Sequence, residues 1–186
     1  MPNIDQSKIL ILSTNGFEQS ELEFPRDQLR AKGATVHVAT PDGAEIMGWD
    51  GDDWGRPAEA DLALSAASVD DYDALVLPGG QINPDLLRVN DGAIELIRAF
   101  VNEGKIVAAI CHAPWLLVES GVAEGREMTS YHSIKTDVQN AGAHWVDQEI
   151  AISNGIITSR SPEDLKAFVS KIVEEVEEGK HARDAA

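Results

Sequence analysis

Short runs of strand-forming residues recur along the chain and alternate with segments whose apolar residues repeat at helical spacing. The predicted strands lie at residues 9–12, 35–39, 74–77, 107–110 and 156–159. Continuous apolar runs of this length are typical of parallel strands that are covered on both faces. Apolar residues share one face of a predicted helix over 91–103. The alternation predicts a doubly wound, mostly parallel α/β sandwich.

Further helices are predicted at residues 20–33, at 134–141 and after Ser161. Ser20 can cap the first of these, with Glu23 placed for a capping box, before a glycine at position 33 ends the helix. Pro25 is expected near its first turn, because proline cannot donate a helical hydrogen bond. These helices complete the βαβ units that the sandwich requires.

The remaining segments are shorter or irregular. Residues 128–130 predict a short strand, and Asn154-Gly155 predicts a hairpin turn between strands at 145–152 and 156–159. The stretch 40–68 is rich in Gly and Asp, with a short strand predicted near 61–64. We expect most of this stretch to cover one end of the sheet.

Composition narrows the possible classes of protein. The chain has 186 residues, 43% of them hydrophobic, and shows no break in composition, so one domain over residues 1–186 is expected. A net charge of −17 repels phosphate backbones and anionic lipids, so neither nucleic acid nor membrane is an expected partner. The acidic cluster Glu174, Glu175, Glu177 and Glu178 is expected on the solvated side of the last helix. The single cysteine excludes an internal disulfide, and MPNIDQSK lacks the core of a signal peptide, which predicts a cytoplasmic protein.

The only cysteine, Cys111, lies in KIVAAICHAPWLLVES, where a buried strand runs into a helix. At such a turn a side chain stands clear of the sheet, as in the nucleophile elbow of hydrolases. We expect the helix N-terminus and His112 to lower the pKa of the thiol. A lone cysteine can equally be a small buried apolar residue. The adjacent His112 favours the nucleophile.

Polar or glycine-rich segments follow two other strands, and in a parallel sheet these exits meet beside Cys111. Glu18 is either a solvated acid at a helix start or a carboxyl group that shares a proton with the thiolate. Gly79-Gly80 is either a tight turn or a source of backbone N–H groups for an oxyanion, together with the N–H of His112. The three exits therefore predict one site.

Four motifs resemble the DJ-one/PfpI superfamily, and within it the PfpI-like general stress proteins, which are sometimes classed as intracellular cysteine peptidases. The motifs are GFEQSEL at 16–22, DALVLPGG at 73–80, AICHAP at 109–114 and TSRSPEDL at 158–165. The resemblance implies a flavodoxin-like fold related to glutamine amidotransferase domains. It also implies Cys111 as nucleophile, Glu18 as the carboxyl group at the sulfur, and Gly80 with His112 as oxyanion donors.

The same resemblance implies at least a homodimer, because PfpI-like peptidases complete their triad with an acid from a neighbouring subunit. Asp85 occupies the comparable place here, after a segment that is one residue longer than in the peptidases, and Asp replaces Glu. The expected partners are a second copy of the chain and a small carbonyl substrate or glycated protein. No Cys, His and acid cluster has the spacing of a metal site, so we expect no metal and no organic cofactor.

We therefore expect a cytoplasmic stress-response protein whose Cys111 attacks reactive carbonyl compounds such as methylglyoxal or its early adducts on amines. A cysteine peptidase is the alternative enzyme. A sensor or chaperone that uses oxidation of Cys111 is the non-catalytic alternative.

Overall fold

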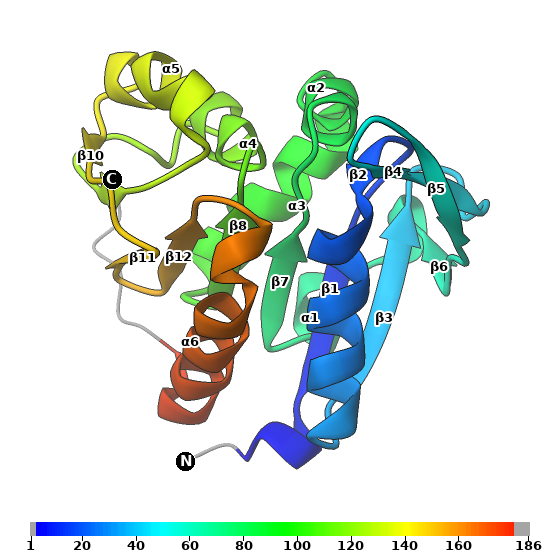
Figure 1. Ribbon diagram of the computed structural model, residues 1–186. Coiled ribbons are helices and arrows are strands. Elements are labelled where there is room, and N and C mark those ends of the chain that lie inside the picture. Colours follow the sequence, from blue (N-terminus) through cyan, green and yellow to red (C-terminus); the bar gives the residue numbers. More distant parts are fainter. Residues whose placement is uncertain (1–2, 181–186) are drawn as a thin grey trace.

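A computed structural model describes residues 3–180, and the expected domain over 1–186 includes eight terminal residues outside this range. A seven-stranded sheet forms the centre, in the order β11-β12-β8-β7-β1-β3-β6 (Figure 1). Its strands are β1 Lys8–Leu12, β3 Thr35–Thr40, β6 Leu62–Ala63, β7 Ala74–Leu77, β8 Ile106–Ile110, β11 Ile150–Ser153 and β12 Ile156–Ser159. All neighbours are parallel except β11 and β12. The predicted flavodoxin-like α/β fold is confirmed.

Helices cover both faces of this sheet. They are α1 Gln19–Ala31, α2 Ile82–Leu87, α3 Asp91–Asn102, α4 Pro114–Glu119, α5 Lys135–Asn140 and α6 Leu165–Glu178. Alternate side chains of β1 enter two separate cores, with Leu10 beside α3 and α4, and Ile11 beside α1 and α6. Figure 1 shows α1 and α6 on one face of the sheet. Each strand is therefore buried on both faces, which explains its continuous apolar sequence.

The start of α1 differs from the prediction. The helix begins at Gln19 with Glu18 in the N-cap position, and no side chain caps it, so the predicted Ser20 cap is wrong. Pro25 lies inside the helix and not in its first turn. Its ring is buried, so packing against the core compensates for the missing N–H donor. The residue at which α1 begins sets which of its faces is buried, and so decides which acidic side chain turns toward the sheet.

Residues 40–68 are more regular than predicted. β4 Ile46–Asp50 and β5 Asp53–Ala58 form an antiparallel hairpin, and β4 also pairs with β2 Phe17–Glu18. Trp49 and Trp54 face each other across the hairpin, with ring centroids 5.4 Å apart at 77°. β6 confirms the short strand near 61–64. The hairpin reaches the carboxyl end of β1, where Asn15 Oδ1 accepts a hydrogen bond of 2.8 Å from Met47 N–H.

Three further differences from the prediction lie elsewhere in the chain. The segment 145–152 is two strands, because β10 His144–Trp145 pairs with β9 Glu127–Met128 before β11 begins. The turn at Asn154-Gly155 is confirmed, with φ values of 50° and 75°. The last helix starts with a 3₁₀ turn at Pro162–Asp164, and α2 was not predicted. Among residues 3–180, none of the helices has the length and apolar character needed to span a bilayer.

Candidate active site

Cys111 lies directly after β8, between the ends of the neighbouring strands. Its φ is 65°, in the left-handed region that costs a non-glycine residue roughly 1–2 kcal/mol. Two backbone hydrogen bonds hold it there: Cys111 N–H donates to Ser159 O (3.0 Å), and Cys111 O accepts from Tyr131 N–H (2.8 Å). The predicted elbow geometry is confirmed, and it turns the side chain out of the sheet.

The carboxyl group beside the sulfur belongs to Glu21, on the first turn of α1. This side chain is completely buried, and its Oε2 accepts a hydrogen bond of 2.8 Å from Gly79 N–H. The same carboxyl group lies beside Cys111, and a charge on it raises the pKa of the Cys111 thiol. Burial, and next the charge of Glu18, raise the pKa of Glu21 to about 8. Glu21 is therefore mainly protonated at neutral pH and can donate its proton to the sulfur.

The prediction that Glu18 contacts the sulfur is wrong. Glu18 precedes the first residue of α1 and is half-buried in the wall of the same cavity. Burial, and next the charge of Asp50, raise its pKa. The acid three residues later turns toward the sheet because it shares the buried face of α1 with Leu22. A carboxyl group on the apolar face of a helix is the signal in the sequence that could have identified Glu21.

The electrostatic prediction for Cys111 also needs correction. Burial raises the pKa of the Cys111 thiol, and a charged Glu21 raises it further, whereas the N–H groups of Gly80 and His112 lower it. Burial, and next His132, lower the pKa of the His112 imidazole to about 4. His112 is therefore neutral at pH 7 and gives the sulfur no positive charge. A thiolate here depends on N–H donors and on the Glu21 proton.

The two glycines after β7 have different roles. The backbone N–H groups of Gly80 and His112 lower the pKa of the Cys111 thiol, which is consistent with the predicted pair of oxyanion donors. Gly79 N–H is already used by Glu21, so Gly79 does not supply the third donor that was expected. A Cβ on Gly79 would lie 2.5 Å from Glu21 Oε2 and 2.7 Å from Cys111 Cβ. Position 79 must therefore be glycine for the thiol and the carboxyl group to meet.

The His112 ring has a hydrogen-bond partner at each nitrogen. Nδ1 lies 3.2 Å from Cys111 Sγ, and Nε2 lies 3.2 Å from Ser133 Oγ. The ring stacks on Tyr131, with centroids 4.7 Å apart at 26°. Asp85 is exposed on α2 and is not among the residues that line the cavity of its own chain. Ser133 and Tyr131 were not predicted, because only the tertiary hydrogen bond from Tyr131 to Cys111 brings them to the site.

A cavity of about 560 Å³ opens in front of the sulfur. It is lined by Gly16, Glu18, Glu21, Trp49, Gly51, Gly80, Gln81, Ile82, Cys111, His112, Tyr131 and Pro162. A second cavity of about 610 Å³ shares Tyr131 and Pro162 with the first. The first cavity has the size of a small-molecule site. The hairpin of β4 and β5 provides one of its walls through Trp49, which gives the stretch 40–68 the covering position that the sequence predicted.

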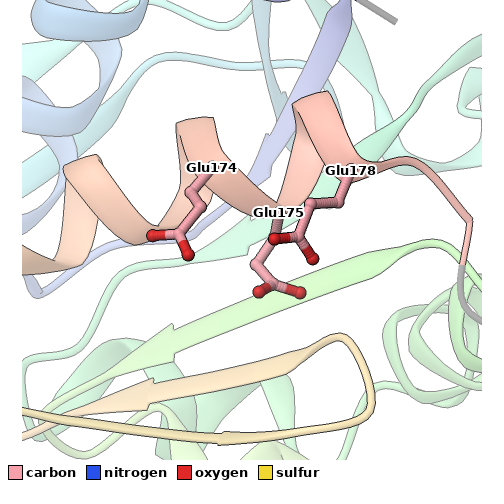
Figure 2. A group of neighbouring side chains, drawn as sticks. All are labelled: Glu174, Glu175 and Glu178. Carbon is pink, nitrogen blue, oxygen red and sulfur yellow. The ribbon is translucent and has the colours of Figure 1, made fainter. Parts of the chain in front are cut away.

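A group of carboxylates lies elsewhere, at the end of α6. Glu174, Glu175 and Glu178 place carboxylate oxygens within 4.8 Å of one another (Figure 2). Glu175 is buried, so the prediction that the whole acidic cluster is solvated is wrong for this residue. Glu174 is paired with Lys171 Nζ at 2.8 Å. The cavity in front of Cys111 lies at the other, N-terminal end of α6, where Pro162 lines it. These carboxylates therefore take no part in the site.

A flavodoxin-like sheet with a cysteine at a nucleophile elbow and a buried carboxyl group beside it defines a class of proteins. The family model described as "DJ-1/PfpI family" matches residues 7–175. Deglycase TK1284 from Thermococcus kodakarensis is 40% identical over 166 residues, 89% of this chain and 97% of that protein. Putative cysteine protease YraA from Bacillus subtilis is 40% identical over 162 residues, 87% and 93% of the two chains. The crystal structure of Drosophila melanogaster DJ-1beta shares 31% identity at a TM-score of 0.82, covering 92% and 94%. The chain belongs to the DJ-1/PfpI family.

Proposed function

We propose that this protein is a cytoplasmic, cysteine-dependent deglycase or glyoxalase that converts methylglyoxal, or its early adducts on amines, into a hydroxy acid. The observation that supports this most strongly is the pairing of Cys111 with the buried, protonatable Glu21 at the floor of a small cavity. A carbonyl addition needs a nucleophile and a movable proton, and the pair supplies both. Relatives named as deglycases and as a putative cysteine protease agree with a hydrolase of this family.

The first step adds the Cys111 thiolate to the aldehyde carbon of methylglyoxal. A C–S bond forms, the carbonyl electrons move to oxygen, and the N–H groups of Gly80 and His112 stabilise that oxygen. The Glu21 proton then converts the alkoxide into a hemithioacetal. Glu21 begins this step with a proton because burial holds it in the neutral form.

The second step moves hydrogen between the two carbons. Glu21, now a carboxylate, removes the C–H proton of the hemithioacetal carbon to give an enediolate and returns that proton to the adjacent carbon, while the hydroxyl proton of the hemithioacetal moves to the former ketone oxygen. The product is a lactoyl thioester on Cys111. Water hydrolyses this thioester to lactate and frees the thiol. An adduct on an amine follows the same course once the C–N bond breaks and the amine leaves with a proton.

A direct test compares methylglyoxal, a methylglyoxal-treated N-acetylated lysine or arginine, and a fluorogenic peptide as substrates. The wild type and Cys111→Ala are purified together, and lactate, free amine and peptide cleavage are measured separately. Lactate formation that depends on Cys111 is the expected result. Peptide cleavage without lactate favours the peptidase. Neither activity, combined with accumulation of Cys111 sulfinic acid under peroxide, favours the oxidation sensor.

We also propose that the protein is at least a homodimer that assembles through α2. This helix and the residues after it expose Ile82 (37%), Leu86 (49%) and Val89 (80%), and Asp85 lies on the same short segment. Exposed apolar side chains this close together are typical of an interaction surface. Ile82 also lines the cavity, so a second copy seated on α2 would lie next to the mouth of the site.

A further inference from the structure

Ser133 is a polar residue beside the site with no role in the reaction proposed above. It lies in the 3₁₀ turn His132–Ile134, and its exposed hydroxyl group is 3.2 Å from Nε2 of His112. One hydrogen bond joins this turn to the elbow, from Tyr131 N–H to Cys111 O (2.8 Å), and another closes the turn itself, from Ile134 N–H to Tyr131 O (3.2 Å). The contact between Ser133 and His112 therefore forms within a single chain and needs no second subunit.

The sulfur side of the ring decides which nitrogen carries the proton. The backbone N–H groups of Gly80 and His112 favour negative charge on the sulfur, and the protonated carboxyl group of Glu21 is a further donor beside it. A sulfur atom surrounded by donors acts as an acceptor, and a thiolate can only accept. Nδ1 of His112, at 3.2 Å, joins these groups by donating its hydrogen. A neutral imidazole has one N–H, so Nε2 is then an acceptor that needs a donor.

Ser133 is the hydroxyl group placed to be that donor. We propose that Ser133 is a positioning residue whose O–H donates to Nε2 of His112 and holds the ring proton on Nδ1, facing the sulfur of Cys111. This proposal rests on the proposed function, because it assigns His112 the task of stabilising the thiolate that attacks the carbonyl group. It also means that His112 does not remove the thiol proton.

A serine and a carboxylate at this place have opposite effects. A carboxylate only accepts hydrogen bonds, so it would draw the ring proton to Nε2 and leave Nδ1 as a base toward the thiol. That is the arrangement of a triad, and it is the arrangement expected if Asp85 of a second copy reached His112. Because Ser133 already occupies Nε2 of His112, we expect Asp85→Asn to leave the tautomer of His112 unchanged.

The test measures the tautomer directly by ¹⁵N NMR of labelled protein. The wild type and Ser133→Thr, which keeps the hydroxyl group, are expected to carry the His112 proton on Nδ1. Ser133→Asp is expected to move it to Nε2, and Ser133→Ala to shift the population toward Nε2. Thr136→Ala, which removes an exposed hydroxyl group from α5, is the matched control and is expected to behave as the wild type. A wild-type proton on Nε2 would overturn the proposal.

A second readout is the alkylation rate of Cys111 by iodoacetamide between pH 5 and pH 10. Losing one hydrogen bond to the thiolate is expected to slow alkylation of Ser133→Ala at pH 7 roughly 3- to 10-fold, with recovery in Ser133→Thr. The titratable groups facing His112 are Cys111, Tyr131 and His132, with Glu21 beyond the sulfur, and all are unchanged in these variants. Equal profiles and tautomers for the wild type and Ser133→Ala would refute the role of Ser133.

Neither readout uses a carbonyl substrate. A protein that fails to convert methylglyoxal but shows the Nδ1–H tautomer and the serine dependence would contradict the proposed function alone. A protein that converts methylglyoxal with Nε2 protonated would contradict the role of Ser133 alone.

Discussion

Replacing Glu21 by Gln keeps the shape of the side chain and removes the proton that the buried carboxyl group binds. Burial raises the pKa of Glu21 from 4.5 to about 8, so the folded protein holds this proton over a pH range in which the unfolded chain releases it. The stabilisation is fully present below pH 4.5 and is lost as the pH rises through 8. The difference between the two pKa values corresponds to about 5 kcal/mol, an upper limit because Cys111 shares the charge.

The assay is urea unfolding at intervals from pH 5 to pH 9, for the wild type and Glu21→Gln. The wild type is expected to lose about 4 kcal/mol relative to the variant over this range, because part of the total is already lost below pH 5. His112 contributes with the opposite sign, because a pKa lowered to about 4 favours folding as the pH rises to 6.5, but this effect cancels between the two proteins. Glu95→Gln is the matched control, because its carboxyl group is exposed on α3 and does not line the cavity in front of Cys111.

If the difference in unfolding free energy between the wild type and Glu21→Gln does not change with pH, Glu21 does not hold a buried proton. If the free energy of unfolding falls with pH by a similar amount in Glu21→Gln and in the control variant, the cause is the overall charge of the protein, −17 at pH 7, and not Glu21. Glu21→Gln is also expected to bind methylglyoxal without turnover, because Gln cannot accept the C–H proton. Lactate formation at the wild-type rate would contradict that role.

Three further predictions concern the surroundings of the sulfur. Gly79→Ala is expected to cost about 1–3 kcal/mol and to abolish activity, because its Cβ would lie 2.5 Å from Glu21 Oε2; thermal unfolding and lactate formation check both. Trp49→Ala is expected to raise KM with a smaller change in kcat, because Trp49 lines the cavity away from the reacting atoms, and a lower kcat at unchanged KM would contradict this. Light scattering is expected to show at least a dimer, and Leu86→Glu on the exposed face of α2 is expected to lower the mass, whereas a monomeric wild type would exclude the proposed assembly.

The nucleophile and the central sheet could be predicted because their signals are local. Four or more apolar residues in succession define β8, and Cys111 follows at its end. To choose between Glu18 and Glu21, one must know which face of α1 is buried, and this depends on whether the helix begins at Gln19 or later. The burial of Leu22 and Pro25 fixes that face, so the information was present as a pattern, but the proline obscured it.

Other features depend on tertiary contacts. The β4 and β5 hairpin escaped prediction because β5 is exposed over most of its length and buries only its last residue, Ala58, so its sequence lacks the alternation of a half-buried strand. Ser133 is far from His112 in sequence, and only the bond between Tyr131 N–H and Cys111 O brings the two together. The low pKa of His112 follows from burial, which the residue type does not reveal.

The central claim is that Cys111 forms a covalent intermediate with the carbonyl substrate. Rapid quenching of the enzyme mixed with methylglyoxal, followed by mass spectrometry of the peptide that contains Cys111, measures this directly. A lactoyl thioester on Cys111 should form and decay at the turnover rate, and it should be absent from Cys111→Ala, which makes no lactate. Lactate production by Cys111→Ala at the wild-type rate, or turnover with no adduct on Cys111, would contradict the claim.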